Sequence, residues 1–177
     1  MRNLLFLLLL GFGSCSSSKV ELVQADLLVT NIDQYCGKRV AIEGVIIHIC
    51  GVDGTKMKLR TDGGAIVKVV TSKNIPFFDG KFYKKRIRVQ GLVQESRVDS
   101  SYVSNVEACK DLLCHIDNNP CKDSVWTRKQ VEKGRADSLS QNDLARLRRR
   151  MKETGKPYVS TAIICADNIE IIEKEDN

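Results

Sequence analysis

The sequence predicts a mainly β domain with a helical insertion, an α+β chain built on a five-stranded barrel. Two long segments, residues 39–50 and 86–93, each carry a central glycine, and each begins as an alternation of polar and apolar residues. The first becomes apolar on both faces after Gly44. Two short alternating segments lie between them, and a helical stretch separates them from a last strand-like segment, residues 158–166. A glycine inside a strand usually marks a bulge or tight bend, which a small barrel needs where one strand serves two sheets.

The elements before the insertion follow from local patterns. Apolar residues at helical spacing predict a helix within residues 23–37, ending at Gly37. Short strands are expected at residues 56–60 and 65–71, next to the turn sequences Val52-Asp53-Gly54 and Asp62-Gly63-Gly64. A brief helical turn is expected at residues 81–85, directly before the second long strand.

The pattern becomes helical after Val98. Apolar residues that recur at helical spacing predict one helix over residues 102–116, and residues 122–135 are weakly helical. The sequence from Ser140 to Asp143 has the spacing of a capping box and predicts the start of a helix that ends at Gly155. A strand over residues 158–166, a turn at Asp167-Asn168 and a return strand over residues 169–172 complete the chain.

Five strands with glycines in the first and fourth resemble the OB-fold, a Greek-key barrel, here with an N-terminal helix and a helical insertion between strands four and five. The segments VAIEGVIIHIC, KMKL, FDG and IRVQGLV resemble exported OB-fold lipoproteins of anaerobic Gram-negative bacteria, over about residues 25–175. That family is uncharacterised and is labelled nucleic-acid-binding-like by its fold alone, which does not supply a function. Its members often have a second cysteine where this chain has Met57.

The N-terminus predicts export and lipidation. A basic start and an apolar run from Leu4 to Leu10 are typical of a signal peptide, and the run is too short to span a bilayer. Phe12-Gly13-Ser14-Cys15 resembles the bacterial lipobox, which implies cleavage after residue 14 and lipidation of Cys15. Several acyl chains make a stable anchor. We therefore expect a signal peptide over residues 1–14, a lipidated tether over 15–22 and an OB-fold domain over 23–177, with its insertion at about 100–156.

Residue types near the anchor also predict a location. Ser16 after the lipidated cysteine resembles an outer-membrane signal, and no acidic run follows it. We therefore expect the protein on the periplasmic face of the outer membrane, with surface exposure as the alternative.

The formal net charge of +6 is concentrated in one segment. Residues 122–156 hold eleven basic and five acidic residues, so the rest of the exported chain is close to neutral. The densest basic run is a candidate binding surface for a protein, a glycan or an anionic lipid headgroup, and a solvated helix face is the alternative. Its members are Arg146, Arg148, Arg149, Arg150 and Lys152. No acidic residue lies between Arg146 and Arg150, which predicts a purely basic helix face.

Cysteines and histidines supply two further candidate sites. Six cysteines remain after lipidation of Cys15, and Cys114 and Cys121, which flank an Asn-Asn-Pro turn, are the most plausible disulfide in an oxidising compartment. Buried free thiols are the alternative. The spacing of Cys109, Cys114, His115 and Cys121 fits no zinc motif. A soft metal could instead be held by His48 and Cys50, which share a strand face, together with Met57.

No catalytic motif is present, so we expect a non-catalytic protein without catalytic residues and without a cofactor. The first expected function is a membrane-anchored periplasmic lipoprotein whose OB-fold module binds a protein, glycan or lipid headgroup. The second is a single-stranded nucleic-acid-binding protein. The third is a periplasmic protein that binds a soft metal.

Overall fold

The computed structural model describes residues 20–172, and five strands within this range form a closed barrel. They are β2 (Arg39–Ile49), β3 (Lys56–Arg60), β4 (Ile66–Val70), β5 (Arg86–Asp99) and β6 (Tyr158–Ile171). The strand order is β2-β3-β4-β6-β5, and pairing of β5 with β2 closes the barrel. Only the β4–β6 pair within this ring is parallel. A five-stranded Greek-key barrel with this connectivity is an OB-fold, as the sequence predicts.

The segment before the barrel forms a short strand and two short helices. Strand β1 (Glu21–Leu22) pairs with β2 in parallel, so the last two residues of the predicted tether belong to the sheet. The predicted single helix is divided at Asn31 into α1 (Ala25–Thr30) and α2 (Ile32–Tyr35). Cys15 and the predicted signal peptide lie outside the described residues. Within residues 20–172, no helix is long and apolar enough to cross a membrane.

The central glycines lie where the barrel strands bend, as predicted. Strand β2 pairs with β5 as far as Val45 and with β3 from Val45 onward, so Gly44 lies at the change of partner. A Cβ atom on Gly44 would lie 2.5 Å from the carbonyl oxygen of Arg60. Gly91 lies at a register shift between β5 and β6, and a Cβ there would collide with the backbone of Cys165. Both positions therefore require glycine for close backbone approach.

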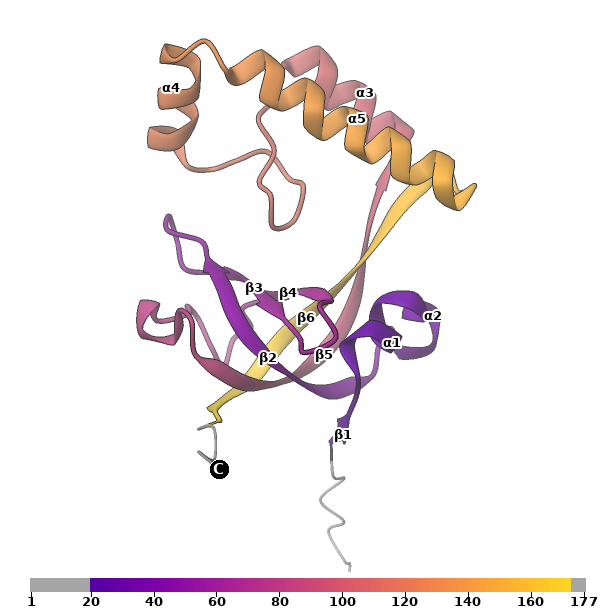
Figure 1. Cartoon of the computed structure of the whole chain (residues 1–177), viewed down its shortest axis with the longest axis vertical. Coiled ribbons are helices and arrows are strands. Elements are labelled where there is room, and N and C mark those ends of the chain that lie inside the picture. The colour runs from indigo at the N-terminus through magenta and orange to yellow at the C-terminus, as the bar shows by residue number, and fades with distance from the viewer. Residues whose placement is uncertain (1–19, 173–177) are drawn as a thin grey trace, which may run out of the picture.

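Strands β5 and β6 continue beyond the barrel as a two-stranded ribbon that carries the insertion (Figure 1). The insertion contains α3 (Ser100–Cys109), α4 (Ser124–Glu132) and α5 (Ala136–Thr154). It has its own small core, separate from the barrel core, in which residues of α3 and α5 pack on the ribbon. This core contains Val98, Val103, Val106, Leu113, Leu144, Leu147 and Val159.

Three local predictions within and after the insertion are wrong. Helix α3 ends at Cys109, because Lys110 adopts a left-handed conformation, and Leu113 and Ile116 therefore lie in a loop. Helix α5 begins at Ala136, so Ser140 is not its cap; Ser140 is buried and its Oγ donates a hydrogen bond to the carbonyl of Asp111 at 3.0 Å. Asp167-Asn168 is not a turn, because β6 stays paired with β5 through this point and the register shift at Gly91 absorbs one residue.

Different elements lie at the two ends of the molecule. Strand β1 and the end of β6 lie at one end of the barrel, and the helical insertion lies at the opposite end (Figure 1). The β2–β3 turn, residues 50–55, lies at the end of the barrel nearer the insertion. OB-folds bind their ligands on the face of the second and third barrel strands, here β3 and β4, and at two loops. These loops are the β2–β3 turn and the connection between β5 and β6, which here holds the insertion.

Candidate functional site

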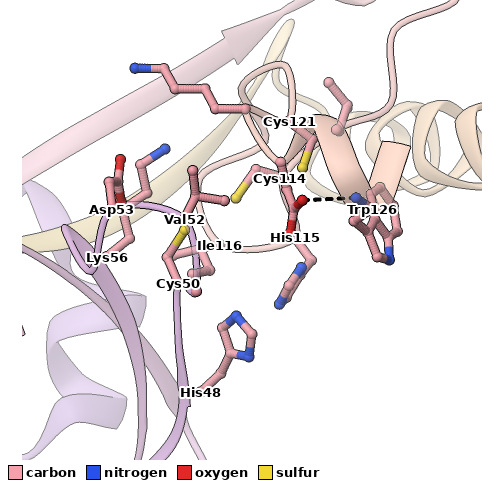
Figure 2. Close-up of a pocket in the computed structure, with 14 residues that line it drawn as sticks. His48, Cys50, Val52, Asp53, Lys56, Cys114, His115, Ile116, Cys121 and Trp126 are labelled. Carbon is pink, nitrogen blue, oxygen red and sulfur yellow. Dashed lines mark hydrogen bonds between the residues drawn. The ribbon is translucent and has the colours of Figure 1, made fainter. Parts of the chain in front are cut away.

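A cavity of about 230 Å³ lies between the β2–β3 turn and the loop-and-helix segment of the insertion, residues 113–126 (Figure 2). The barrel contributes residues from the end of β2 through the start of β3. The insertion contributes residues from the loop between α3 and α4 and from the first turn of α4. Labelled in Figure 2 are His48, Cys50, Val52, Asp53, Lys56, Cys114, His115, Ile116, Cys121 and Trp126.

The barrel wall is held by a hydrogen-bonded turn. The Asp53 carboxylate accepts hydrogen bonds from the backbone amide of Thr55 at 2.9 Å and from its hydroxyl at 2.8 Å. The amide of Thr55 is the main reason that the pKa of Asp53 lies below its usual value. The turn therefore carries a fixed negative charge at neutral pH, at the cavity edge.

The insertion wall is a tight loop that folds back on itself. The amide of Cys114 donates to the carbonyl of Asn119, and the amide of Cys121 donates to the carbonyl of Leu112, both at 2.7 Å. Asn118 adopts a left-handed conformation at the tip, and its carbonyl accepts from the Tyr102 hydroxyl at 2.6 Å. These contacts place Cys114 and Cys121 on either side of the predicted turn, facing the barrel.

An ion pair joins the two walls. The Lys56 ammonium lies 2.5 Å from Asp117 Oδ2, and both side chains are largely buried. Burial works to raise the pKa of Asp117, but Lys56 and the amides of Asn119 hold it below its usual value. Burial likewise works to lower the pKa of Lys56, and Asp117 raises it above its usual value. Both groups are therefore charged at neutral pH, and the pair links β3 to the insertion.

The two histidines of the chain meet at the cavity, one from each wall. The rings of His48 and His115 are arranged edge to face, with their centroids 4.4 Å apart. Burial lowers the pKa of both, and the charge of Lys58 lowers it further. Both imidazoles are therefore neutral at neutral pH, so each offers one donor and one acceptor nitrogen.

Three cysteines line the same cavity. Figure 2 shows the sulfur atoms of Cys50, Cys114 and Cys121 around one space. All six cysteines of the described residues are free thiols, so the predicted Cys114–Cys121 disulfide is absent from this structure. Burial raises the pKa of the Cys114 thiol, which keeps it protonated and weakly nucleophilic.

The predicted His48–Cys50–Met57 metal site does not form. The strand register places Lys58, not Met57, opposite His48, and Met57 points into the barrel core with none of its surface exposed. Among residues 20–172, no group of three His, Cys, Asp or Glu side chains is arranged to hold a metal ion. The sequence pattern missed this because it does not show which face of β3 turns inward.

The basic residues of α5 do not form one purely basic surface, and that prediction is wrong. Arg148 pairs with Glu107 at 2.5 Å, and Arg149 lies 3.7 Å from Glu153; both arginines are exposed. Arg146 is half-buried and donates to Asp143 at 2.9 Å and to Asn118 at 3.2 Å. Arg150 is also half-buried, one helical turn further along the same face, and Lys152 is exposed.

Two features of this site could not be expected from single segments of the sequence. Trp126, the only tryptophan, lies at the cavity, because Asp123 caps α4 by accepting from the Trp126 amide at 2.8 Å. Lys58 and Lys68 lie opposite each other on β3 and β4. The sequence does contain one signal for this pair of lysines, which is a lysine at an alternating position in each of two adjacent short strands.

No protein-family model and no curated protein sequence matches this chain. Among solved structures, the chain is similar to replication protein A of U. maydis, which was solved bound to single-stranded DNA. The match has 20% sequence identity and a TM-score of 0.32, and it covers 41% of this chain and 57% of that chain. The matched part is thus little more than half of the replication protein chain. The OB-fold assignment rests on the strand order.

Proposed function

We propose that this protein is a non-catalytic, membrane-anchored lipoprotein of the periplasm that binds a ligand on the barrel face covered by its helical insertion. The observation that carries the proposal is the cavity between the β2–β3 turn and residues 113–126. It lies on the side where OB-folds bind ligands, and it contains neutral histidines, thiols and a tryptophan rather than a catalytic arrangement.

The lipid anchor bears on which ligand this face would meet. Six peptide units separate Cys15 from Glu21 at the start of β1, and they span at most about 20 Å when extended. Strand β1 lies at the barrel end remote from the insertion (Figure 1). A lipid on Cys15 would thus hold the β1 end near the bilayer and the insertion away from it. This favours a protein, glycan or other periplasmic ligand over a headgroup of the anchoring membrane.

A single-stranded oligonucleotide is the second candidate ligand. A groove of about 610 Å³ lies on the other side of the β2–β3 turn, and Phe77 and Tyr83, which line it, are 62% and 49% exposed. Exposed aromatic rings of this kind stack on bases. Fluorescence anisotropy with a labelled single-stranded oligonucleotide at low salt tests this function. Binding that Phe77→Ala and Tyr83→Ala weaken would support it, and no binding at low salt would exclude it.

The anchor is tested by membrane fractionation of Cys15→Ala. The variant should leave the membrane fraction and lose acyl labelling, whereas Cys36→Ala, which changes an exposed cysteine of the folded domain, should remain membrane-bound and labelled. Unchanged retention of Cys15→Ala would contradict the anchor.

Ligand binding at the cavity is tested by the emission of Trp126. Fractions of periplasmic extract that contain the ligand should shift the emission of the wild type. They should not shift that of Val52→Phe, which adds a ring at a cavity-lining residue. Val125→Phe, a change on the exposed side of α4 outside the cavity lining, should respond like the wild type. An equal shift in Val52→Phe would place binding elsewhere.

A further inference from the structure

A row of basic side chains crosses three adjacent strands beside the cavity. His48 on β2 lies opposite Lys58 on β3, and Lys58 lies opposite Lys68 on β4. Their chain neighbours Met57, Leu59, Val67 and Val69 are fully buried in the barrel core. The row therefore lies on the outer face of the barrel, because successive side chains of a strand point to opposite faces.

Residues of the helical insertion lie near this row and add positive charge to it. Arg146 and Arg150, four residues apart on the half-buried side of α5, both act electrostatically on Lys68. The acidic groups that face the row are Asp117 and Asp143. Asp117 is already paired with Lys56, and Asp143 is already paired with Arg146. Among the described residues, the side chains of Lys58, Lys68 and Arg150 have no ion-pair partner.

Such an arrangement is costly for an empty surface. Like charges directly opposite on neighbouring strands repel, and partial burial of a cation adds a desolvation penalty. The pKa values reflect this: burial and the neighbouring cations lower the pKa of Lys68 to about 8, and burial lowers that of Lys58. A bound anion would relieve both costs, because it supplies the counter-charge that the protein itself lacks there.

We propose that Lys58, Lys68 and Arg150 bind a small oxyanion with two negative charges, such as a phosphate or sulfate group, between the barrel and α5. Three cations without partners match a dianion better than a neutral ligand. The partial burial of these side chains favours a small group over an extended polymer. This inference rests on the proposed function, because it specifies the charge of the ligand that would bind on the barrel face next to the insertion.

The test is isothermal titration of the detergent-solubilised full chain with inorganic phosphate and with sulfate, at constant ionic strength. One anion should bind per chain. Lys68→Met and Arg150→Gln should each weaken binding about tenfold or more, since each removes a charged contact. Arg149→Gln changes an exposed arginine of the same helix and should bind like the wild type. Equal heats in the wild type and in both site variants would overturn the proposal.

The pH dependence gives an independent arm. Sulfate keeps its charge between pH 7 and 9, whereas Lys68 loses its proton near pH 8 in the free protein. Sulfate affinity should therefore fall over this range in the wild type and fall less in Lys68→Arg, in which position 68 remains charged. The groups that face Lys68 are Asp117, Lys58, Arg146 and Arg150. Identical pH profiles in the two proteins would contradict a role for Lys68.

A third arm separates the sources of the anion. Vesicles of phosphatidylglycerol should bind the wild type and Lys68→Met equally, because Lys58 and Lys68 are partly buried. Lys68-dependent binding to vesicles, with no binding of free phosphate or sulfate, would overturn the proposal.

The tests of this inference and of the proposed function can fail separately. If no anion binds, the proposed membrane anchor and the proposed ligand cavity still stand. If Cys15→Ala leaves the membrane, its anion binding should be unchanged. Circular dichroism of each variant checks its fold, and Lys58→Met provides a second variant of the row.

Discussion

His115 of the helical insertion packs edge to face against His48 of the barrel, with ring centroids 4.4 Å apart. The contact joins two parts of the chain that have separate hydrophobic cores. Together with the Lys56–Asp117 ion pair, it positions the insertion over the barrel face and so defines the cavity.

The histidine pair predicts a loss of stability at mildly acidic pH. In the folded state the pKa of both is below the unfolded value of about 6.5, through burial and the charge of Lys58. As pH falls below that value, the unfolded chain takes up protons that the folded chain resists, so the free energy of unfolding decreases. Urea unfolding between pH 7.5 and 5.5 should show a smaller decrease for the double variant His48→Gln with His115→Gln. Because the chain has only two histidines, an unchanged slope in this variant would contradict the prediction.

We predict that replacement of Lys68 increases the stability of the protein while it weakens anion binding. Replacing it with methionine removes a partly buried cation opposite Lys58, so Lys68→Met should be more stable than the wild type by about 1 kcal/mol at pH 7. The difference should shrink above pH 8, because the pKa of Lys68 is lowered to about 8 in the folded state and the wild type then sheds the charge. Chemical unfolding at pH 7 and pH 9 measures both values. A less stable Lys68→Met at pH 7 would show that the lysine has a stabilising partner.

The bend of β5 predicts a strict requirement for glycine at position 91. A methyl group there would collide with the backbone of Cys165, so Gly91→Ala should destabilise the fold by about 1–3 kcal/mol. Gly80→Ala is the matched control, because a Cβ at that position has no neighbour within 4 Å, and its cost should be small. Thermal or urea unfolding of the two variants compares them directly. Equal stability would mean that β5 and β6 do not approach closely at this bulge.

The Lys56–Asp117 pair predicts how firmly the insertion loop is held. Asp117→Asn leaves a largely buried ammonium without its charge partner and should cost about 1–3 kcal/mol. Exchange of the Cys114 and Cys121 amides, which close the loop, should accelerate at least tenfold. Glu153→Gln removes the exposed partner of Arg149 and should leave these rates unchanged. Unchanged exchange in Asp117→Asn would show that the loop is held by other contacts.

The barrel was largely predictable from sequence, because alternation and the glycines at positions 44 and 91 report on strands that bend within one sheet. Prediction failed where a tertiary partner decided the outcome. Asp167-Asn168 resembles a turn, yet β5 continues to offer hydrogen bonds there. Ser140 resembles a cap, yet it is buried inside α5 and bonded to Asp111.

The candidate site was less predictable than the fold, because it is assembled from segments far apart in the chain. The sequence presented His48 with Cys50 and, separately, Cys114 with His115 and Cys121; the fold of the insertion brings both groups to one cavity. Periodicity also cannot distinguish the two faces of a short strand. For that reason the sequence offers Met57 as a candidate metal ligand, whereas in the structure its neighbour Lys58 faces His48.

Native mass spectrometry of the protein extracted from its own membrane, compared with Val52→Phe and Val125→Phe, tests the central claim most directly. The wild type and Val125→Phe should carry a bound molecule at one per chain, and Val52→Phe, which narrows the cavity, should carry little or none. An unliganded wild type, or equal occupancy in Val52→Phe, would contradict the assignment of this cavity as the binding site.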